Sequence, residues 1–379
     1  MRLLIVDDAK TDLDACRTSK ERWNRSHSGE SVISELVEIK TYPDARQYFK
    51  SHDACAIDGI ILDLKLAEQA DAGQLLIDDL NAMHRRMPIV VFTATQDPLS
   101  FQYLLGAFKK GDKPYDAAFE RFEIAQKVGL TKILGCDGVI DRQLKDIFDK
   151  AIVPRLDSWK KYVDAAGSEN AERALSRSVV MHLHEAMDED DAYAPDEFYV
   201  SNLEDSDYVK SGEVLRRKTG GSPSQYVVVI SPACDLALYG DPCKPKSDVV
   251  QVCELEAAEA LLKSVGGCIS KSVAKKSKKA GDDSETVQKK SAAAVRSFND
   301  KVFSNQYALY YHYFPTAVDL EGSIMNFRRL KTHTHAEVSN EYVKTGYIVS
   351  PNFFRDIQAR FAAYYGRQGQ PELNIVAKG

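Results

Sequence analysis

The sequence lacks the features of secreted and membrane-embedded proteins. Its seven cysteines are an odd number and form no closely spaced pairs, unlike a secreted disulfide framework. No apolar run approaches the roughly 18 residues of a membrane-spanning helix, and the N-terminal apolar run is too short for a signal peptide. We therefore expect a cytoplasmic protein with no membrane partner and with mostly reduced cysteines.

The chain also lacks an excess of positive charge. Its formal net charge is −6 over 379 residues, so DNA binding is not expected and would need a local basic patch. One candidate patch, residues 263–290, has eight lysines, three acids and no aromatic residue. Nucleic-acid surfaces normally add arginine or stacking aromatics. We interpret this segment as a solvated or mobile insertion that is dispensable for folding.

What the sequence does contain is a set of continuous apolar runs that end on polar side chains. The run from Met1 ends on Asp7 and Asp8, the run from Gly59 ends on Asp63, and the run from Pro88 ends on Thr93. Such runs are typical of strands buried on both faces of a parallel sheet. The carboxyl ends of those strands meet at one edge, where ligands and chemistry collect. Taken alone, Asp63 could equally cap the turn after its strand.

In the order, strand context and spacing of these residues, the chain resembles the receiver domain of two-component response regulators. The resemblance implies a flavodoxin-like, doubly wound, five-stranded parallel sheet over residues 1–157. It implies that Asp63 accepts a phosphoryl group from a histidine kinase as an acyl phosphate. It also implies Mg²⁺ binding by Asp8 and Asp63 directly, by Asp7 through water, and by the carbonyl of Lys65. Thr93 would donate a hydrogen bond to the phosphoryl group.

The sequence departs from the family after Thr93. We expect an insertion over residues 96–134 and a fifth strand over Gly135–Asp141. Receivers end this strand on Lys followed by Pro, and Arg142 and Gln143 stand at the matching positions. Arg142 is therefore expected to supply the phosphoryl-binding cation, although a guanidinium is not interchangeable with an ammonium.

The remaining chain predicts a helical connector and acidic linker over residues 158–198, then an α+β, mainly β, domain over residues 199–379. Cys234 and Asp235 follow a strong predicted strand, and this part resembles a module fused to receiver-like domains in bacterial defence-associated proteins. A metal site joining Cys234 to Cys243, Cys253 or the histidines at 182, 184, 333 and 335 is an alternative to a packed structural cysteine.

Together these features predict a phosphoryl acceptor that serves as a signalling, relay or phosphoryl-sink protein. The resemblances imply a histidine kinase, a downstream effector and an antiphage pathway as its context. Two alternatives stay open. One is an effector enzyme, controlled by the receiver, that acts through Cys234, Asp235 or a metal. The other is a scaffold that works without phosphorylation.

Overall fold

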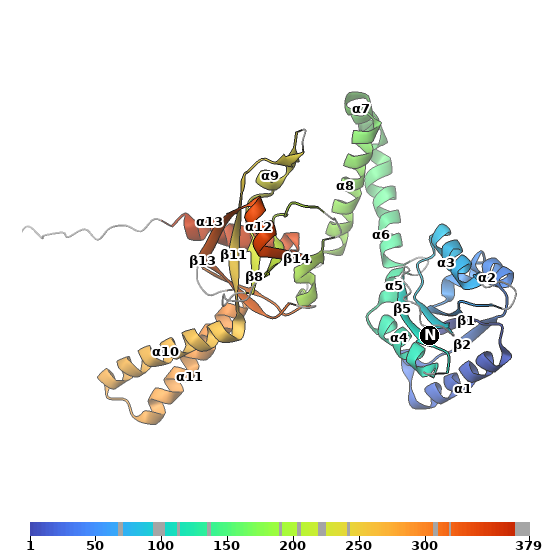
Figure 1. Ribbon diagram of the computed structural model, residues 1–379, viewed down its shortest axis with the longest axis horizontal. Helices are drawn as coiled ribbons and strands as arrows, with labels where there is room; N and C mark the ends of the chain where they lie inside the picture. The colour runs from blue at the N-terminus through green and yellow to red at the C-terminus, as the bar shows by residue number, and fades with distance from the viewer. Residues whose placement is uncertain are drawn as a thin grey trace, which may run out of the picture. The chain divides into compact units, whose positions relative to one another are not determined.

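The structure is a computed structural model. It describes residues 1–66, 71–93, 103–111, 114–134, 138–188, 192–202, 206–218, 225–240, 243–305, 310–317 and 320–367. The chain divides into two units, Met1–Asp190 and Asp191–Gly379, each described below by itself (Figure 1). Among the helices of the described residues, none combines the length and apolar character needed to cross a membrane.

The first unit is built on a five-stranded parallel sheet in the order β2-β1-β3-β4-β5. Its strands are β1 (Arg2–Val6), β2 (Glu35–Ile39), β3 (Gly59–Asp63), β4 (Ile89–Thr93) and β5 (Leu104–Lys109). Strands β3 and β4 are buried at every position, as their continuous apolar runs predict. This order is the doubly wound, flavodoxin-like arrangement, so the predicted fold class is confirmed.

Helices cover both faces of this sheet. They are α1 (Lys10–Ser26), α2 (Tyr42–Phe49), α3 (Ala72–Ala82), α4 (Asp116–Lys127) and the short α5 (Leu130–Leu134), with 3-10 turns η1 (Gly29–Ser31) and η2 (Asp53–Ala56). Residues of α2 and α3 pack into one core, and residues of α1 and α4 pack into the core on the opposite face. Gly59 makes the second core possible, since a Cβ there would lie 2.3 Å from Cε1 of Phe122.

The fifth strand is not where the sequence predicted it. Strand β5 and helix α4 both lie within residues 96–134, so the prediction that these residues form an insertion is wrong. Residues 135–137 lie outside the described residues, and Gly138 precedes a helix that includes Arg142. Strand β5 was hard to recognise because it is an edge strand, half-exposed or exposed along its length and interrupted by Gly106.

A helical hairpin, residues 139–187, completes the first unit. Its outgoing arm is α6 (Val139–Ile147), the π-helical turn η3 (Phe148–Ile152), the 3-10 turn η4 (Val153–Arg155) and α7 (Leu156–Ala166). Gly167, with φ of 86°, turns the chain into the returning arm, α8 (Ser168–Met187). Helix α8 packs along α6 and α7 (Figure 1). The predicted helical connector therefore belongs to a hairpin of two antiparallel arms.

The second unit contains a seven-stranded antiparallel sheet in the order β12-β13-β11-β8-β7-β14-β6. Its strands are β6 (Tyr199–Ser201), β7 (Glu213–Arg217), β8 (Tyr226–Val229), β11 (Val249–Ala257), β12 (Tyr311–Phe314), β13 (Ser323–Thr334) and β14 (Tyr342–Val349); β9 (Leu238–Tyr239) and β10 (Lys244–Pro245) pair separately. This agrees with the predicted α+β, mainly β, domain.

The helices of this unit are η5 (Pro195–Phe198), α9 (Ala233–Leu236), α10 (Ala258–Ala280), α11 (Ser284–Phe303), α12 (His335–Glu341) and α13 (Pro351–Tyr365). Helix α13 buries Phe354 and Ile357 in the aromatic-rich core on one face of the sheet. The lysine-rich segment, expected to be a solvated or mobile insertion, instead forms parts of α10 and α11. These helices pack on each other and bury Leu261, Phe298 and Val302 at their base.

Candidate phosphoacceptor site

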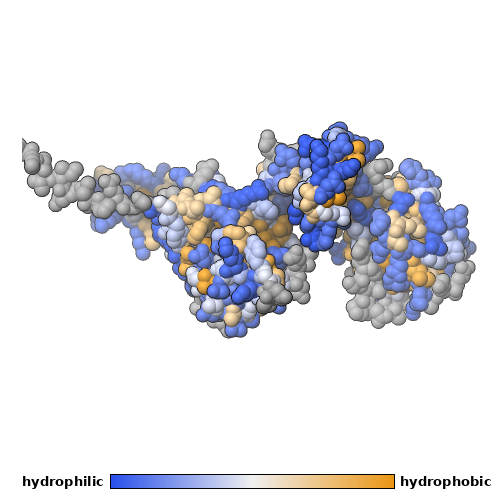
Figure 2. Space-filling view, turned by 90° about the horizontal axis from the view of Figure 1, so that it is seen from above, coloured by the Kyte–Doolittle hydropathy of each residue, from blue (hydrophilic) through white to orange (hydrophobic). Residues whose placement is uncertain are grey.

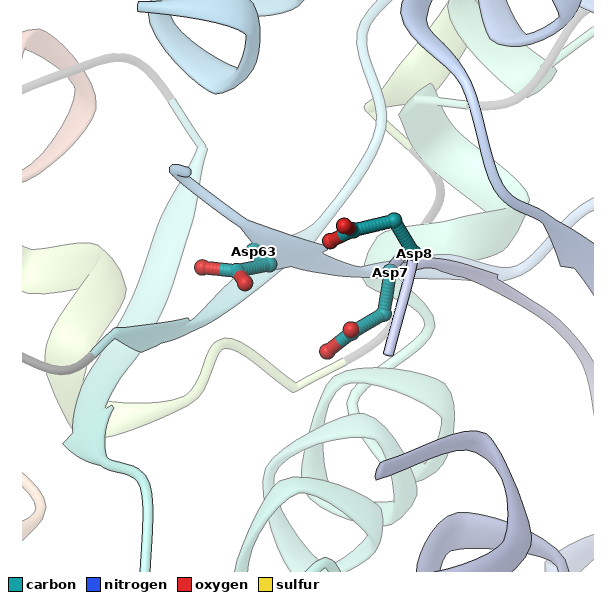
Figure 3. A group of neighbouring side chains, drawn as sticks. All are labelled: Asp7, Asp8 and Asp63. Carbon is teal, nitrogen blue, oxygen red and sulfur yellow. The ribbon is translucent and has the colours of Figure 1, made fainter. Parts of the chain in front are cut away.

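Three aspartates meet at the carboxyl edge of the parallel sheet. Asp7 follows β1, and Asp63 ends β3, which pairs with β1 so that Val6 lies opposite Leu62. One carboxylate oxygen from each of Asp7, Asp8 and Asp63 lies within 4.8 Å of the others. Asp7 and Asp63 are buried, whereas Asp8 is half-buried. Figure 3 shows the three side chains beside one another at this edge.

A lysine that the sequence analysis did not single out lies among these acids. Lys110 directly follows β5, and its backbone N–H donates to the carbonyl of Thr93 at 2.9 Å. Its Nζ donates to Oδ2 of Asp7, Asp12 and Asp63, each at 2.7 Å. One ammonium thus links the ends of β1, β3 and β5 with the first turn of α1.

The two buried carboxylates have the same pattern of partners. Oδ1 of Asp7 accepts from the N–H of Ala9 at 2.9 Å, and Oδ1 of Asp63 accepts from the N–H of Lys65 at 3.1 Å. In both residues the other oxygen faces Lys110. A backbone donor two residues downstream therefore fixes one oxygen of each acid, and the ammonium holds the other.

Burial and charge act in opposite directions on this cluster. Burial disfavours the ammonium of Lys110, but its hydrogen bonds to Asp12, Asp63 and Asp7 outweigh burial, so its pKa is raised. Burial raises the pKa of Asp7, and Lys110 offsets only part of that effect. Keeping Asp7 ionised next to other carboxylates costs free energy, and a bound cation reduces that cost.

Thr93 ends β4 at the same edge and is 4% exposed. Its neighbour Phe92 is in register with Asp63, and Thr93 itself is in register with Lys109. The sheet therefore brings Asp7, Asp8, Asp63 and Thr93 to one edge, as the sequence predicted. The N–H of Lys65 also lies at this edge, whereas the metal-binding role of its carbonyl stays a prediction.

A hollow of about 410 Å³ adjoins the cluster on the side of α1 and α4, where Asp12, Phe92, Lys110 and Tyr115 line it. The ring of Tyr115 lies 4.5 Å from that of Phe92. Burial, together with the charges of Asp7 and Asp12, raises the pKa of Tyr115. This hydroxyl is therefore neutral beside the acids over the ordinary pH range.

Arg142 is not the cation at the end of the fifth strand. It lies on α6, and the described residue that follows the true fifth strand is Lys110. The expectation failed because Gly135–Asp141 imitates an apolar run ending on an acid. A usable signal was present: Leu104–Phe108 is a second such run, and it ends on Lys109 and Lys110. Asp12 was not predicted as a site residue because it does not stand at the end of an apolar run.

Among the residues that the structure describes, Cys234 and Asp235 belong to no group of three or more metal-ligating side chains. Cys234 is exposed on the short helix α9, with its Sγ 3.7 Å from Oδ1 of Asp235. Cys253 is buried, donates to the carbonyl of Asn326, and has its pKa raised by burial. In the described ranges, Asp7, Asp8 and Asp63 form the only group of three or more residues with metal-ligating atoms close together.

The predicted histidine ligands make other contacts. Nδ1 of His182 lies 2.9 Å from the carbonyl of Ser178, and Nε2 of His335 lies 2.9 Å from the carbonyl of Ser247. His333 contacts Tyr342 and Glu341. His182 thus contacts its own helix α8, and His333 and His335 contact neighbouring residues of the second unit.

No protein-family model matches this chain, and no curated protein matches it. Solved structures with a similar fold include the receiver domain of the Francisella response regulator 1452, at 18% identity over 34% of this chain and 97% of that chain, with a TM-score of 0.26. A CheY-like response regulator receiver domain from Methylobacillus flagellatus is 17% identical over 32% of this chain and 98% of that chain, with a TM-score of 0.24. The Mn²⁺-bound response regulator Rcp1 is 17% identical over 34% and 90% of the chains, with a TM-score of 0.22.

Proposed function

We propose that the first unit is a response-regulator-like phosphoacceptor in which Asp63 accepts a phosphoryl group from a phosphohistidine on a histidine kinase. A carboxylate oxygen of Asp63 attacks phosphorus, a P–O bond forms, and the P–N bond breaks with its electron pair returning to the imidazole. The observation that carries this proposal is the convergence of Lys110 on Asp63 at the edge that also holds Asp7, Asp8 and Thr93.

Each neighbouring residue has a role in this step. Lys110 moves from the carboxylate of Asp63 to a phosphoryl oxygen and compensates the charge that arrives there. The N–H of Lys65 orients Asp63, since it already holds Oδ1. The hydroxyl of Thr93 donates to a second phosphoryl oxygen. Asp7 remains paired with the ammonium through Oδ2.

The acidic group fits a divalent cation such as Mg²⁺. Asp7, Asp8 and Asp63 present oxygen atoms within 4.8 Å of one another, and hard cations prefer such ligands. Asp8 and Asp63 would hold the ion directly, Asp7 through water, and the Lys65 carbonyl would be a further ligand. A bound Mg²⁺ supplies neutralisation of the phosphoryl oxygens.

The test is phosphorylation of the full chain by acetyl phosphate with Mg²⁺, followed by mass spectrometry of the acyl phosphate. We expect one phosphoryl group on Asp63 and none in Asp63→Asn, which keeps the shape of the side chain. Asp78→Asn is the matched control, because Asp78 is an exposed acid on α3. Equal labelling of Asp63→Asn and the unmodified chain would refute the assignment.

A phosphorylation-independent scaffold is the second candidate. The observation that favours it is that Lys110 already pairs with three carboxylates, which stabilises the unphosphorylated arrangement. In that case no labelling occurs, and Lys110 serves stability alone. Signalling to a downstream effector and a role in antiphage defence belong to the first candidate and depend on its phosphoryl transfer.

A further inference from the structure

The hairpin of α10 and α11, residues 258–303, concentrates positive charge in an acidic chain. It projects from the sheet of the second unit (Figure 1). It carries ten basic and five acidic side chains, a net charge of +5, whereas the whole chain carries −6. The hairpin can therefore attract a polyanion that the protein as a whole would repel.

Four lysines of α10 form a stripe on one face of the helix. All four are exposed and recur at the helical spacing i, i+4, i+7 and i+8: Lys271, Lys275, Lys278 and Lys279. Gly266, which faces Val295 of α11, stands nine residues before Lys275, or about two and a half turns. This lysine stripe therefore lies on the side of α10 that points away from α11.

Neighbouring acids do not neutralise the lysine stripe. Within the part of the chain that the structure describes, its four lysines form no ion pair. On α11, by contrast, Lys289 pairs with Glu285 at 2.6 Å. Lys290 pairs with Asp282, also at 2.6 Å. The stripe thus presents four ammonium groups to solvent, and an ammonium binds a phosphate oxygen as a point charge.

A second group of side chains, at the base of the hairpin, supplies planar surfaces. The guanidinium of Arg328 lies over the ring of Tyr310, 3.6 Å from its centroid. The guanidinium of Arg367 lies over the ring of Tyr364 at 4.4 Å. The two tyrosine rings are 6.3 Å apart, so these four side chains form one Arg–Tyr platform. Tyr310 also packs against the core that α10 and α11 share with β12 and β13.

The Arg–Tyr platform provides what residues 263–290 lack. That segment has no arginine and no aromatic residue, which are the side chains on which nucleic-acid bases stack. The platform is assembled from distant parts of the chain, so the fold reveals it and the local composition does not. Arg328 and Arg367 are both exposed. A guanidinium that covers a tyrosine with one face can stack on a base with the other.

These features favour a polynucleotide over a lipid surface. A helix that binds a membrane inserts an apolar face opposite its basic one. In α10 the opposite face packs on α11, and small exposed residues lie among the lysines: Ser264, Gly267 and Cys268. On the face of the second unit that Figure 2 shows, hydrophobic residues are interspersed with hydrophilic ones. Phosphates suit the lysine stripe, and flat bases suit the Arg–Tyr platform.

We propose that the second unit binds single-stranded nucleic acid. The lysine stripe contacts backbone phosphates, and the Arg–Tyr platform stacks on bases that a duplex would keep stacked on one another. Neither group reads the edges of bases, so binding is largely independent of sequence. The proposal rests on the second unit alone and does not depend on phosphoryl transfer to Asp63.

The test is fluorescence anisotropy of labelled single-stranded RNA and DNA with the full chain over a range of salt concentrations. The stripe variant is Lys271→Gln, Lys275→Gln, Lys278→Gln, Lys279→Gln. It should reduce the slope of log affinity against log salt by about 3, since each phosphate contact on a single strand contributes roughly 0.7. The matched control changes four exposed lysines of the first unit and should keep the slope: Lys132→Gln, Lys145→Gln, Lys160→Gln, Lys161→Gln.

The Arg–Tyr platform is tested by Arg328→Lys with Arg367→Lys, which keeps both charges and removes the planar groups. This variant should bind about tenfold more weakly with little change in the salt slope. Tighter binding of RNA than of DNA would support the proposal and add a contact to the 2′-hydroxyl. The proposal would be overturned by tighter binding of a duplex, by equal losses in the stripe variant and its control, or by binding to anionic vesicles but to neither oligonucleotide.

Discussion

Nζ of Lys110 lies 2.7 Å from Oδ2 of Asp63, and the same ammonium donates to Asp7 and Asp12 at the same distance. The last residue of β3 and the residue after β5 are thus joined across β4, which lies between these strands. One cation compensates three acids in a largely buried position.

Replacing Lys110 with methionine should destabilise the first unit by about 3 kcal/mol, because buried acids lose their cation. Mg²⁺ should then raise the melting temperature of Lys110→Met by more than that of the unmodified chain, since a divalent ion can relieve the same repulsion. Lys109→Met is the matched control, as Lys109 is exposed. Equal responses of Lys109→Met and Lys110→Met to Mg²⁺ would contradict this account.

The stabilisation by Lys110 should persist to high pH. Its pKa is raised in the folded chain, while an unfolded lysine titrates at about 10.4. The contribution is therefore fully present below pH about 10 and declines above it, as the unfolded state loses its proton first. Urea unfolding from pH 7 to 11 should show the difference between the unmodified chain and Lys110→Met shrinking above pH about 10. A difference that grows with pH would be inconsistent with the raised pKa.

Gly73 in the first turn of α3 should not tolerate a side chain. A Cβ at this position would lie 2.4 Å from Cα of Leu64 and 2.8 Å from the carbonyl oxygen of Asp63. Gly73→Ala should cost about 3 kcal/mol through overpacking and shift the backbone that carries Asp63. It should therefore also weaken Mg²⁺ binding, measured by calorimetry.

Gly267→Ala in α10 is the control, because no atom lies within 4 Å of its added Cβ. It should stabilise the helix by roughly 0.5–1 kcal/mol, since alanine loses less backbone entropy than glycine. If Gly73→Ala is as well tolerated as Gly267→Ala, the close contact at Gly73 is relaxed in solution and this prediction is wrong.

The sequence predicted the parts of this site that belong to strands buried on both faces. Asp7, Asp63 and Thr93 follow or end uninterrupted apolar runs, which are typical of such strands. Strand β5 was missed because its edge position permits exposed residues and Gly106. In the strand predicted over Gly135–Asp141, the apolar residues from Val139 continue at Leu144 and Ile147, a helical spacing that identifies α6.

The hairpin of α10 and α11 was missed for a different reason. Its inner positions are small, and Gly266 and Ser277 are buried among them. An added Cβ at Gly266 would lie 3.2 Å from Cγ1 of Val295, which shows how closely the helices approach. Small residues such as glycine and serine do not produce a recognisable apolar face in the sequence, so the composition suggested a solvated segment. Lysine content alone could not reveal this packing.

Only the base of that hairpin should matter for folding of the second unit. Replacing residues 268–293 with a short Gly-Ser turn should lower the melting temperature by no more than a few degrees. Phe298→Ala should cost about 3 kcal/mol, because Phe298 is 4% exposed in the core shared with Leu261 and Val302. A large loss in the shortened chain would mean that the distal turns carry stability.

Glu254 should contribute to the free energy of unfolding of the second unit. It is 3% exposed, and its carboxylate lies 2.5 Å from Lys331, 3.3 Å from Arg329 and 3.7 Å from Arg217. Burial raises its pKa, but the cations lower it further, so the carboxylate is charged in the folded chain. Glu254→Gln should cost about 2 kcal/mol in urea unfolding at pH 7, since hydrogen bonds to charged groups are lost.

This loss should depend on pH in a defined direction. Because the folded pKa is below the unfolded value of about 4.3, the stabilisation is present above that pH and disappears as pH falls through the folded pKa. The control is Glu341→Gln, whose 43% exposed side chain pairs with Arg217 and should contribute less than about 1 kcal/mol. A Glu254→Gln penalty that increases toward acid pH would disprove the role of the ion pairs.

Because β14 pairs with β7, strand β7 is synthesised long before one of its neighbours in the sheet. β14 lies between β7 and β6, and Arg217 of β7 pairs with Tyr342, which is 125 residues later in the chain. At roughly 5–20 residues per second on the ribosome, β7 emerges about 6 to 25 seconds before its neighbour. During that interval its unpaired edge can accept a strand from another nascent chain. Slow translation between β7 and β14 should therefore increase aggregation, whereas slow translation of the first unit should not.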